Sequence, residues 1–141
     1  MIPKEVFLSH SSRDRAIANR MAATLRAHGV PVWYSDTNIA TADQWIDAIG
    51  AALRRCDWFM VLLSPASAES RWVKRELSYA LRHRQYDEHL IPVIVEACDY
   101  EELSWTLGEL QMASLDDNPE EGFAKILRRW GIGFDPAKAS S

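Results

Sequence analysis

The stretch Trp58-Phe-Met-Val-Leu-Leu63 consists of six consecutive apolar residues, and Ser64-Pro65 follows it at once. A short run without polar alternation is typical of a strand that is covered on both faces. Strands of that kind occur in parallel sheets with helices on either side. The stretch therefore predicts an inner strand of an α/β domain.

Further apolar runs of strand length recur along the chain. They are Val6–Leu8, Val30–Tyr34, Leu90–Val95 and a weaker candidate, Met112–Leu115. Helical patterns lie between them and are marked by Ile17, Met21 and Leu25, by Ile46, Ile49 and Leu53, by residues 70–84 and by residues 119–130. Strands and helices that alternate with short connections predict a doubly wound parallel sheet with helices on both faces.

Size and charge restrict the class of protein. The chain has 141 residues, with 16 Lys or Arg against 20 Asp or Glu, and a net charge of −4. We expect a single domain over residues 1–134 and a flexible tail over 135–141, because the tail has turn-forming residues and no apolar anchor. The acidic balance argues against electrostatic binding of nucleic acid or an anionic membrane.

The sequence also bears on where in the cell the protein is located. No apolar run approaches the ~20 residues of a membrane span, and no signal peptide is visible. Cys56 and Cys98 are far apart in sequence, which favours reduced, buried thiols. These features predict a cytoplasmic protein.

Several chemistries of this fold class lack their motifs. No glycine follows the first strand, and no Gly-rich loop ending in Gly-Lys-Ser/Thr occurs. The first strand ends in Ser9-His-Ser-Ser12 and the third in Ser64-Pro65, without the clustered Asp residues that a phospho-receiver domain needs. The histidines lack metal-ligand spacing, so no metal site is expected, and His83 and His89 are interpreted as solvated helix-end residues.

Ligands of doubly wound sheets bind beyond the carboxyl ends of the strands, where the winding reverses. The segments expected there are Ser9–Ser12, Ser35–Trp45, Ser64–Trp72 and Glu96–Trp105. This geometry selects the region in which a site should be sought.

The helix that follows the third strand carries an unusual acid. Its expected buried stripe is Val73, Leu77, Ala80 and Leu81, with the basic residues on the opposite face. Glu76 lies at the edge of the stripe, one turn after Trp72, and no residue three or four positions away from it is basic. A carboxylate beside an indole near the strand ends is a candidate site residue with a raised pKa. The alternative, that Glu76 caps or pairs with a residue from elsewhere, stays open.

At this point a family resemblance appears. The chain resembles the TIR domain family in Val6-Phe-Leu-Ser-His10, Trp33-Tyr-Ser-Asp36, Val61-Leu-Leu-Ser-Pro65, Ser70-x-Trp72-x-x-x-Glu76-Leu77 and Leu103-Ser-Trp105. The stretches follow the family's order from about residue 4 to about residue 130, and the Ser-x-Trp-x-x-x-Glu-Leu element is the most specific. The resemblance implies a flavodoxin-like fold of five parallel strands.

The resemblance also implies a function. Many TIR domains cleave NAD at the nicotinamide–ribose bond and release ADP-ribose or a cyclic or conjugated signalling nucleotide, so NAD would be the substrate and no separate cofactor is expected. In the enzymatic members a glutamate that matches Glu76 is catalytic. By analogy, the chain would act in bacterial anti-phage immunity, associate with other TIR domains and signal to a downstream effector through its nucleotide product.

The resemblance and the strand ends together suggest further substrate-binding residues. Ser9 and His10 are expected on the pocket floor, although both could be turn or cap residues. Trp72 is an aromatic wall or a core residue, and Trp45 is a stacking partner or a helix anchor. Asp36 opens the loop to Trp45 and could contact a sugar or a neighbouring subunit. Many family members carry Pro-Gly in this loop, where this chain has none.

Two other functions remain open from the sequence. A non-catalytic TIR module would signal, or subvert host signalling, by binding other TIR domains. A nucleoside or nucleotide N-glycosidase would use the same type of fold on another substrate. The presence of both Glu76 and Trp72 favours the NAD-cleaving enzyme.

Overall fold

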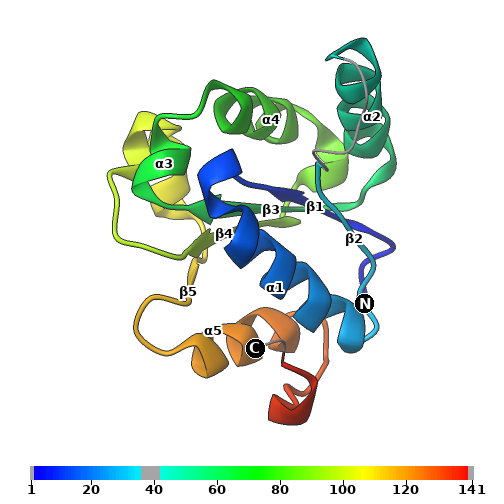
Figure 1. Cartoon of the computed structure of the whole chain (residues 1–141), viewed down its shortest axis with the longest axis vertical. Helices are drawn as coiled ribbons and strands as arrows, with labels where there is room; N and C mark the ends of the chain where they lie inside the picture. Colours follow the sequence, from blue (N-terminus) through cyan, green and yellow to red (C-terminus); the bar gives the residue numbers. More distant parts are fainter. Residues whose placement is uncertain (1, 36–41, 140–141) are drawn as a thin grey trace.

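The computed structural model of the chain describes residues 2–35 and 42–139. Within these residues, five parallel strands form one sheet in the order β2-β1-β3-β4-β5 (Figure 1). The strands are β1 Val6–Ser9, β2 Val32–Trp33, β3 Trp58–Leu63, β4 Leu90–Ile94 and β5 Ala113–Ser114. This order confirms the flavodoxin-like prediction, and its winding reverses between β1 and β3.

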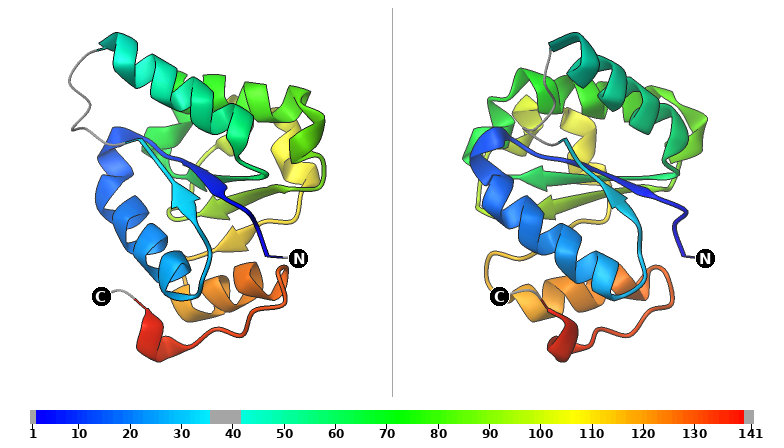
Figure 2. Two further views of the ribbon diagram at one scale, coloured as in Figure 1. Left: turned by 90° about the vertical axis from the view of Figure 1, so that its right-hand side faces the viewer. Right: turned by 45° about the vertical axis from the view of Figure 1, so that its right-hand side comes forward.

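Helices cover both faces of the sheet (Figures 1 and 2). The α-helices are α1 Arg15–Ala27, α2 Ala42–Arg55, α3 Pro65–Ala68, α4 Arg71–Arg82 and α5 Pro119–Arg128. Short 3-10 helices are η1 Ser12–Asp14, η2 Arg84–Tyr86, η3 Tyr100–Glu102, η4 Trp105–Glu109 and η5 Pro136–Lys138. Helices α1 and α5 pack on one face, and α2 and α4 pack on the other.

The side chains of β1 point alternately to the two faces of the sheet, and each face has its own part of the core. Val6 and Leu8 belong to the cluster that packs under α1 and α5. Phe7 belongs to the cluster that includes Ile49 of α2 and Leu77 of α4. Because successive side chains of a strand point to opposite faces, Ser9 follows Phe7 toward α4. This register sets up the site described below.

Most predicted elements are present with small shifts at their ends. The third strand occupies Trp58–Leu63, as predicted, and Gly29 ends α1 with a φ of +85°. Helix α3 was missed, because Ser64-Pro65 was interpreted only as the end of a strand. Ser64 in fact caps α3 through a reciprocal pair of hydrogen bonds with Ser67.

Three sequence interpretations are wrong in whole or in part. Leu81 was placed in the buried stripe of α4 but is 40% exposed, since it borders a hollow beside β4 instead of facing the sheet. His83 and His89 were assigned to solvated helix ends; His83 does cap the C-terminus of α4, but neither side chain is fully solvated. Both rings are half-buried: His83 stacks on Tyr79 with ring centroids 3.6 Å apart, and His89 stacks on Trp58 at 4.3 Å.

The structure also bears on the expectations for the cysteines, for membrane spans and for the C-terminal tail. Cys56 is buried and Cys98 is half-buried, and both are free thiols. No helix in residues 2–35 and 42–139 is long and apolar enough to cross a membrane. At the end of the domain, the Asp135 backbone N–H donates to Nε2 of His28 at 3.0 Å. The domain and tail boundaries stay predictions.

Close packing of α5 on β5 generates a first prediction. A Cβ on Gly122 would overlap the Ser114 carbonyl oxygen and lie 2.5 Å from Cδ2 of Leu115. We expect Gly122→Ala to lower the free energy of unfolding by about 1–3 kcal/mol, because the backbone of β5 must move. Gly108→Ala is the control, since nothing lies within 4 Å of its added Cβ. Denaturant unfolding checks both, and equal stabilities would contradict the packing.

Candidate functional site

The candidate site is built on the end of β1. Ser9 is the last residue of this strand and is 1% exposed. It pairs in register with Val61 of β3, so it lies at the point where the sheet reverses its winding. Its side chain points to the face of the sheet that α4 covers, and the hydroxyl must find a partner there because water cannot reach it.

Helix α4 supplies that partner. Ser70 caps the helix by accepting a hydrogen bond from the Val73 N–H at 3.2 Å, which fixes where the first turn begins. Glu76 follows in the second turn and is 7% exposed. The Ser9 hydroxyl donates to Oε1 of Glu76 at 2.7 Å. Two residues far apart in sequence are thus joined at the carboxyl edge of the sheet.

Burial controls the ionisation of Glu76. The loss of hydration disfavours the carboxylate and raises its pKa to about 7, although the hydrogen bond from Ser9 acts in the opposite direction. Within the described part of the chain, the one ion pair joins Arg55 to Glu5, so no Lys or Arg neutralises Glu76. Glu76 is therefore a buried acid that exchanges its proton near neutral pH.

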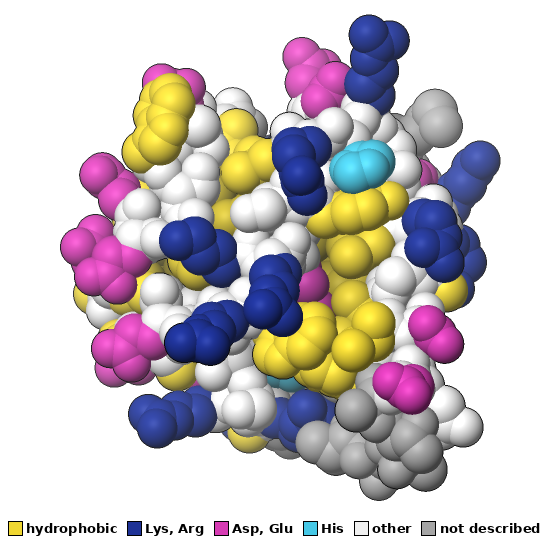
Figure 3. Space-filling model, turned by 90° about the horizontal axis from the view of Figure 1, so that it is seen from above, with side chains coloured by type: hydrophobic (Ala, Val, Ile, Leu, Met, Phe, Trp, Pro, Cys, Tyr) yellow, Lys and Arg dark blue, Asp and Glu magenta, His cyan; other side chains and the backbone are white. Residues whose placement is uncertain are grey.

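Two tryptophans border the helix that carries this acid. Trp45, in the first turn of α2, meets Trp72, in the first turn of α4, edge to face with ring centroids 4.3 Å apart. Both rings are half-buried and pack against the core between the sheet and these helices. Hydrophobic side chains gather beside the basic residues on this side of the molecule (Figure 3). Each indole thus packs against the core and also leaves part of its aromatic surface exposed to solvent.

His10 lies near the same strand end but contacts different residues. Its ring is 8% exposed and meets Tyr34 edge-on at a centroid distance of 5.8 Å. Burial and then the charge of Arg15 lower its pKa, so the ring is neutral at pH 7, even though the nearby Leu8 backbone raises the pKa in part. Neither ring nitrogen has a hydrogen-bond partner with adequate geometry among the described residues. Among residues 2–35 and 42–139, the ring thus has at least one nitrogen without a hydrogen-bond partner.

The structure brings some of the predicted site residues together, and one of them lies outside the described residues. Ser9 contacts Glu76 directly, and Trp45 contacts Trp72. His10 is adjacent to Ser9 in the chain, but its ring lies against Tyr34. Asp36 falls outside the described residues.

Sequence reasoning missed a second buried serine–carboxylate pair. The Ser64 hydroxyl, just beyond β3, donates to Oδ2 of Asp14 at 2.5 Å, and both side chains are buried. The sequence shows no Asp directly at the ends of the first and third strands, because Asp14 reaches the end of β3 from η1. The available signal was Ser11, which caps η1 and so turns the chain back over the strand end.

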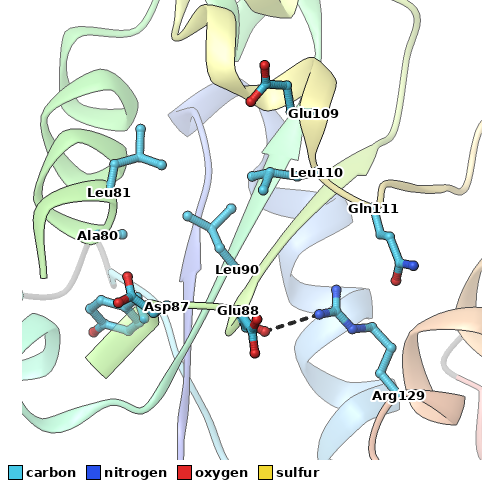
Figure 4. A pocket seen from close by; sticks show the side chains of 10 residues that line it. Ala80, Leu81, Asp87, Glu88, Leu90, Glu109, Leu110, Gln111 and Arg129 are labelled. Carbon is cyan, nitrogen blue, oxygen red and sulfur yellow. Dashed lines mark hydrogen bonds between the residues drawn. The ribbon is translucent and has the colours of Figure 1, made fainter. Parts of the chain in front are cut away.

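In the part of the chain that the structure describes, no cluster of acids or histidines suggests a metal. Among residues 2–35 and 42–139, no three His, Cys, Asp or Glu side chains come together as a metal site would require. A hollow of about 540 Å³ lies elsewhere, beside the start of β4, between α4, η4 and Arg129 (Figure 4). Its lining includes Asp87, Glu88 and Glu109 but none of the predicted site residues.

These features define a class of protein: a flavodoxin-like α/β domain with a buried acid at its switch point. The family model of the TIR domain matches residues 6–127. The chain belongs to the TIR domain family.

Bacterial relatives with named activities match part of the chain. The NAD(+) hydrolase PdTIR of Paracoccus denitrificans is 33% identical over 76 residues, which are 53% of this chain and 25% of the relative. The 2' cyclic ADP-D-ribose synthase AbTIR of Acinetobacter baumannii is 29% identical over 92 residues, which are 63% of this chain and 34% of the relative. The matched parts thus span only a quarter to a third of these relatives.

Solved structures agree on the fold. The TIR domain of the Toll-related receptor TRR-2 from Hydra magnipapillata superimposes with a TM-score of 0.72 at 16% identity, covering 88% of this chain and 95% of that domain. The TIR domains of the Roq1 resistosome give 0.57 at 18% identity, covering 88% and 77%. At these identities the likeness concerns architecture alone.

The buried acid predicts how stability depends on pH. The folded chain keeps the Glu76 proton up to about pH 7, whereas the unfolded chain releases it near 4.5. The unfolded state thus binds fewer protons between these values, so stability falls with rising pH by about 3 kcal/mol in total. Glu76→Gln removes this loss and should be more stable than wild type at pH 8 but nearly equal to it at pH 4.5.

Chemical unfolding at both pH values measures the effect. The exposed Glu102 serves as the control, and Glu102→Gln should follow the wild-type profile. A Glu76→Gln variant that is less stable than wild type at pH 8 would show that the carboxylate is well solvated or paired.

Proposed function

We propose that this chain cleaves NAD at the bond between nicotinamide and ribose, with Glu76 as the catalytic carboxylate. The observation that carries the proposal is the buried acid at the switch point, held by Ser9 and free of any described cationic partner. The names of its relatives, an NAD(+) hydrolase and a cyclic ADP-D-ribose synthase, support the choice of substrate.

The reaction suits a single carboxylate. The bond between C1′ of the ribose and N1 of nicotinamide breaks, and its electron pair goes to the pyridinium nitrogen, so nicotinamide leaves as a neutral molecule. Positive charge develops on the ribose, as in glycoside cleavage. The ionised Glu76 side chain stabilises that charge in a site with little water, where such an interaction contributes a few kcal/mol.

A nucleophile then completes the reaction. The oxygen of water, or of another hydroxyl, forms the new bond to C1′ and releases its proton to Glu76 or to solvent. Attack by water gives ADP-ribose, and attack by a hydroxyl of the nucleotide gives a cyclic product. His10 has at least one ring nitrogen without a partner among the described residues, and it lies near the end of β1, where it could hold a ribose hydroxyl.

The wider setting belongs to the same proposal. We place the activity in bacterial immune signalling, through assembly with other TIR domains and a nucleotide product that acts on a downstream effector. This part is supported by membership of the TIR family. It does not enter the chemistry at Glu76.

The direct test is nicotinamide release from NAD, followed by chromatography. Wild type should release nicotinamide, and Glu76→Gln should lose at least about 100-fold in rate while it stays folded. Glu102→Gln, an exposed change of the same kind, should keep the wild-type rate. Wild type that releases none, even at high protein concentration, would support the non-catalytic module instead. Release of a base from other nucleosides, with NAD left intact, would support the N-glycosidase.

Ionisation of Glu76 should appear in the pH profile. Because the carboxylate is the active form, kcat/KM should rise with pH through an apparent pKa of about 7. Ser9→Ala removes the hydrogen bond that lowers this pKa, so the rising limb should move to higher pH. Ser12→Ala, at an exposed serine three residues further along the chain, is the control and should leave the rising limb in place. A limb that stays in place in Ser9→Ala would exclude Ser9 as the residue that tunes Glu76.

A further inference from the structure

The outer face of α4 carries a row of basic side chains. Arg71, Lys74, Arg75 and Arg82 are all exposed, and none forms an ion pair within residues 2–35 and 42–139. Lys and Arg side chains also line up across the view in Figure 3. In a chain with a net charge of −4, this row is a local concentration of positive charge that no ion pair of the described residues neutralises.

One of these residues is held in position. The Arg75 guanidinium lies over the Trp72 ring, 5.2 Å from its centroid. Trp72 is itself packed edge to face against Trp45 of α2, so two helices fix the ring on which Arg75 rests. A cation–π contact of this kind orients the guanidinium while its N–H groups remain free to bind an anion.

The position relates this cation to the candidate site. Arg75 precedes Glu76 directly, and Arg71 lies one helical turn before Arg75 on the same side of the helix. Arg75 lies over Trp72 and Arg71 lies on the same side of the helix as Arg75, whereas Glu76 turns from this helix toward Ser9 and the sheet. Positive charge therefore lies on the solvent side of the indole, and the acid lies on its buried side.

We propose that Arg75, assisted by Arg71, binds the diphosphate of a dinucleotide whose ribosyl–nicotinamide end reaches Glu76. This inference rests on the proposed function, because it concerns the same substrate. Guanidinium groups bind phosphate oxygens through paired hydrogen bonds. The arrangement also orients the substrate: the arginines attract the diphosphate and repel the nicotinamide cation, which is left to face the carboxylate.

Binding of ADP-ribose tests the proposal without any turnover. ADP-ribose carries the diphosphate and lacks the bond that is cleaved, and calorimetric titration gives its Kd. Arg75→Gln should raise that Kd about tenfold, the loss expected for one charge-assisted bidentate contact. Arg75→Lys, which keeps the charge but not the paired geometry, should fall between Arg75→Gln and wild type.

Two comparisons make the result specific. Arg128→Gln removes an exposed charge on α5, on the opposite face of the sheet, and should leave the Kd unchanged. Adenosine, which has no phosphate, should bind wild type and Arg75→Gln equally. In turnover, Arg75→Gln should raise KM for NAD and leave kcat within about twofold.

The failures of the two proposals can be told apart. If ADP-ribose binds through Arg75 but NAD is not cleaved, the proposed function fails and the phosphate site stands. If NAD is cleaved and ADP-ribose binds Arg75→Gln as tightly as wild type, the phosphate site is overturned and the proposed function stands. Equal losses in Arg75→Gln and Arg128→Gln would show a general charge effect and would also overturn the specific site.

Discussion

A carboxyl group that folding removes from water must find a counter-charge or hold its proton more tightly, and Glu76 does the second. The Ser9 hydroxyl at 2.7 Å is its hydrogen-bond partner in the described chain. Burial is the larger influence, and it brings the pKa of the carboxyl group to about 7. This balance has a cost in stability above neutral pH, and natural proteins retain such a cost chiefly where a functional site requires it.

The fold explains how this acid reaches its position. The strand order β2-β1-β3-β4-β5 reverses the winding between β1 and β3, and the chain leaves the carboxyl ends of these strands in opposite directions. Each exit carries a buried serine, Ser9 on β1 and Ser64 after β3, and each serine donates to a buried carboxylate. One carboxylate, Asp14, ties η1 to the end of β3. The other, Glu76, joins α4 to the end of β1 beside the two indoles.

Much of this arrangement could be predicted from sequence, because it follows from local patterns. The apolar run of β3 and the helical spacing of α1, α4 and α5 predicted the sheet and its layers. The absence of a basic residue one turn from Glu76 predicted its unusual environment. The contact with Ser9 could be anticipated only as proximity, since the side-chain direction depends on the register of β1. Asp14 was missed because its partner lies 50 residues away, and Leu81 was misplaced because helical periodicity cannot show where the sheet stops covering a helix.

The proposed chemistry depends most directly on the ionisation of the Glu76 side chain, which can be observed without any substrate. Carbon-13 NMR of the glutamate carboxyl carbons, with Glu76 assigned by its absence from the Glu76→Gln spectrum, gives the titration midpoint of this group. The account predicts a midpoint near pH 7. A midpoint near the ordinary glutamate value of about 4.5 would show that the carboxylate is hydrated or paired in solution, and would contradict the buried acid from which the proposed chemistry follows.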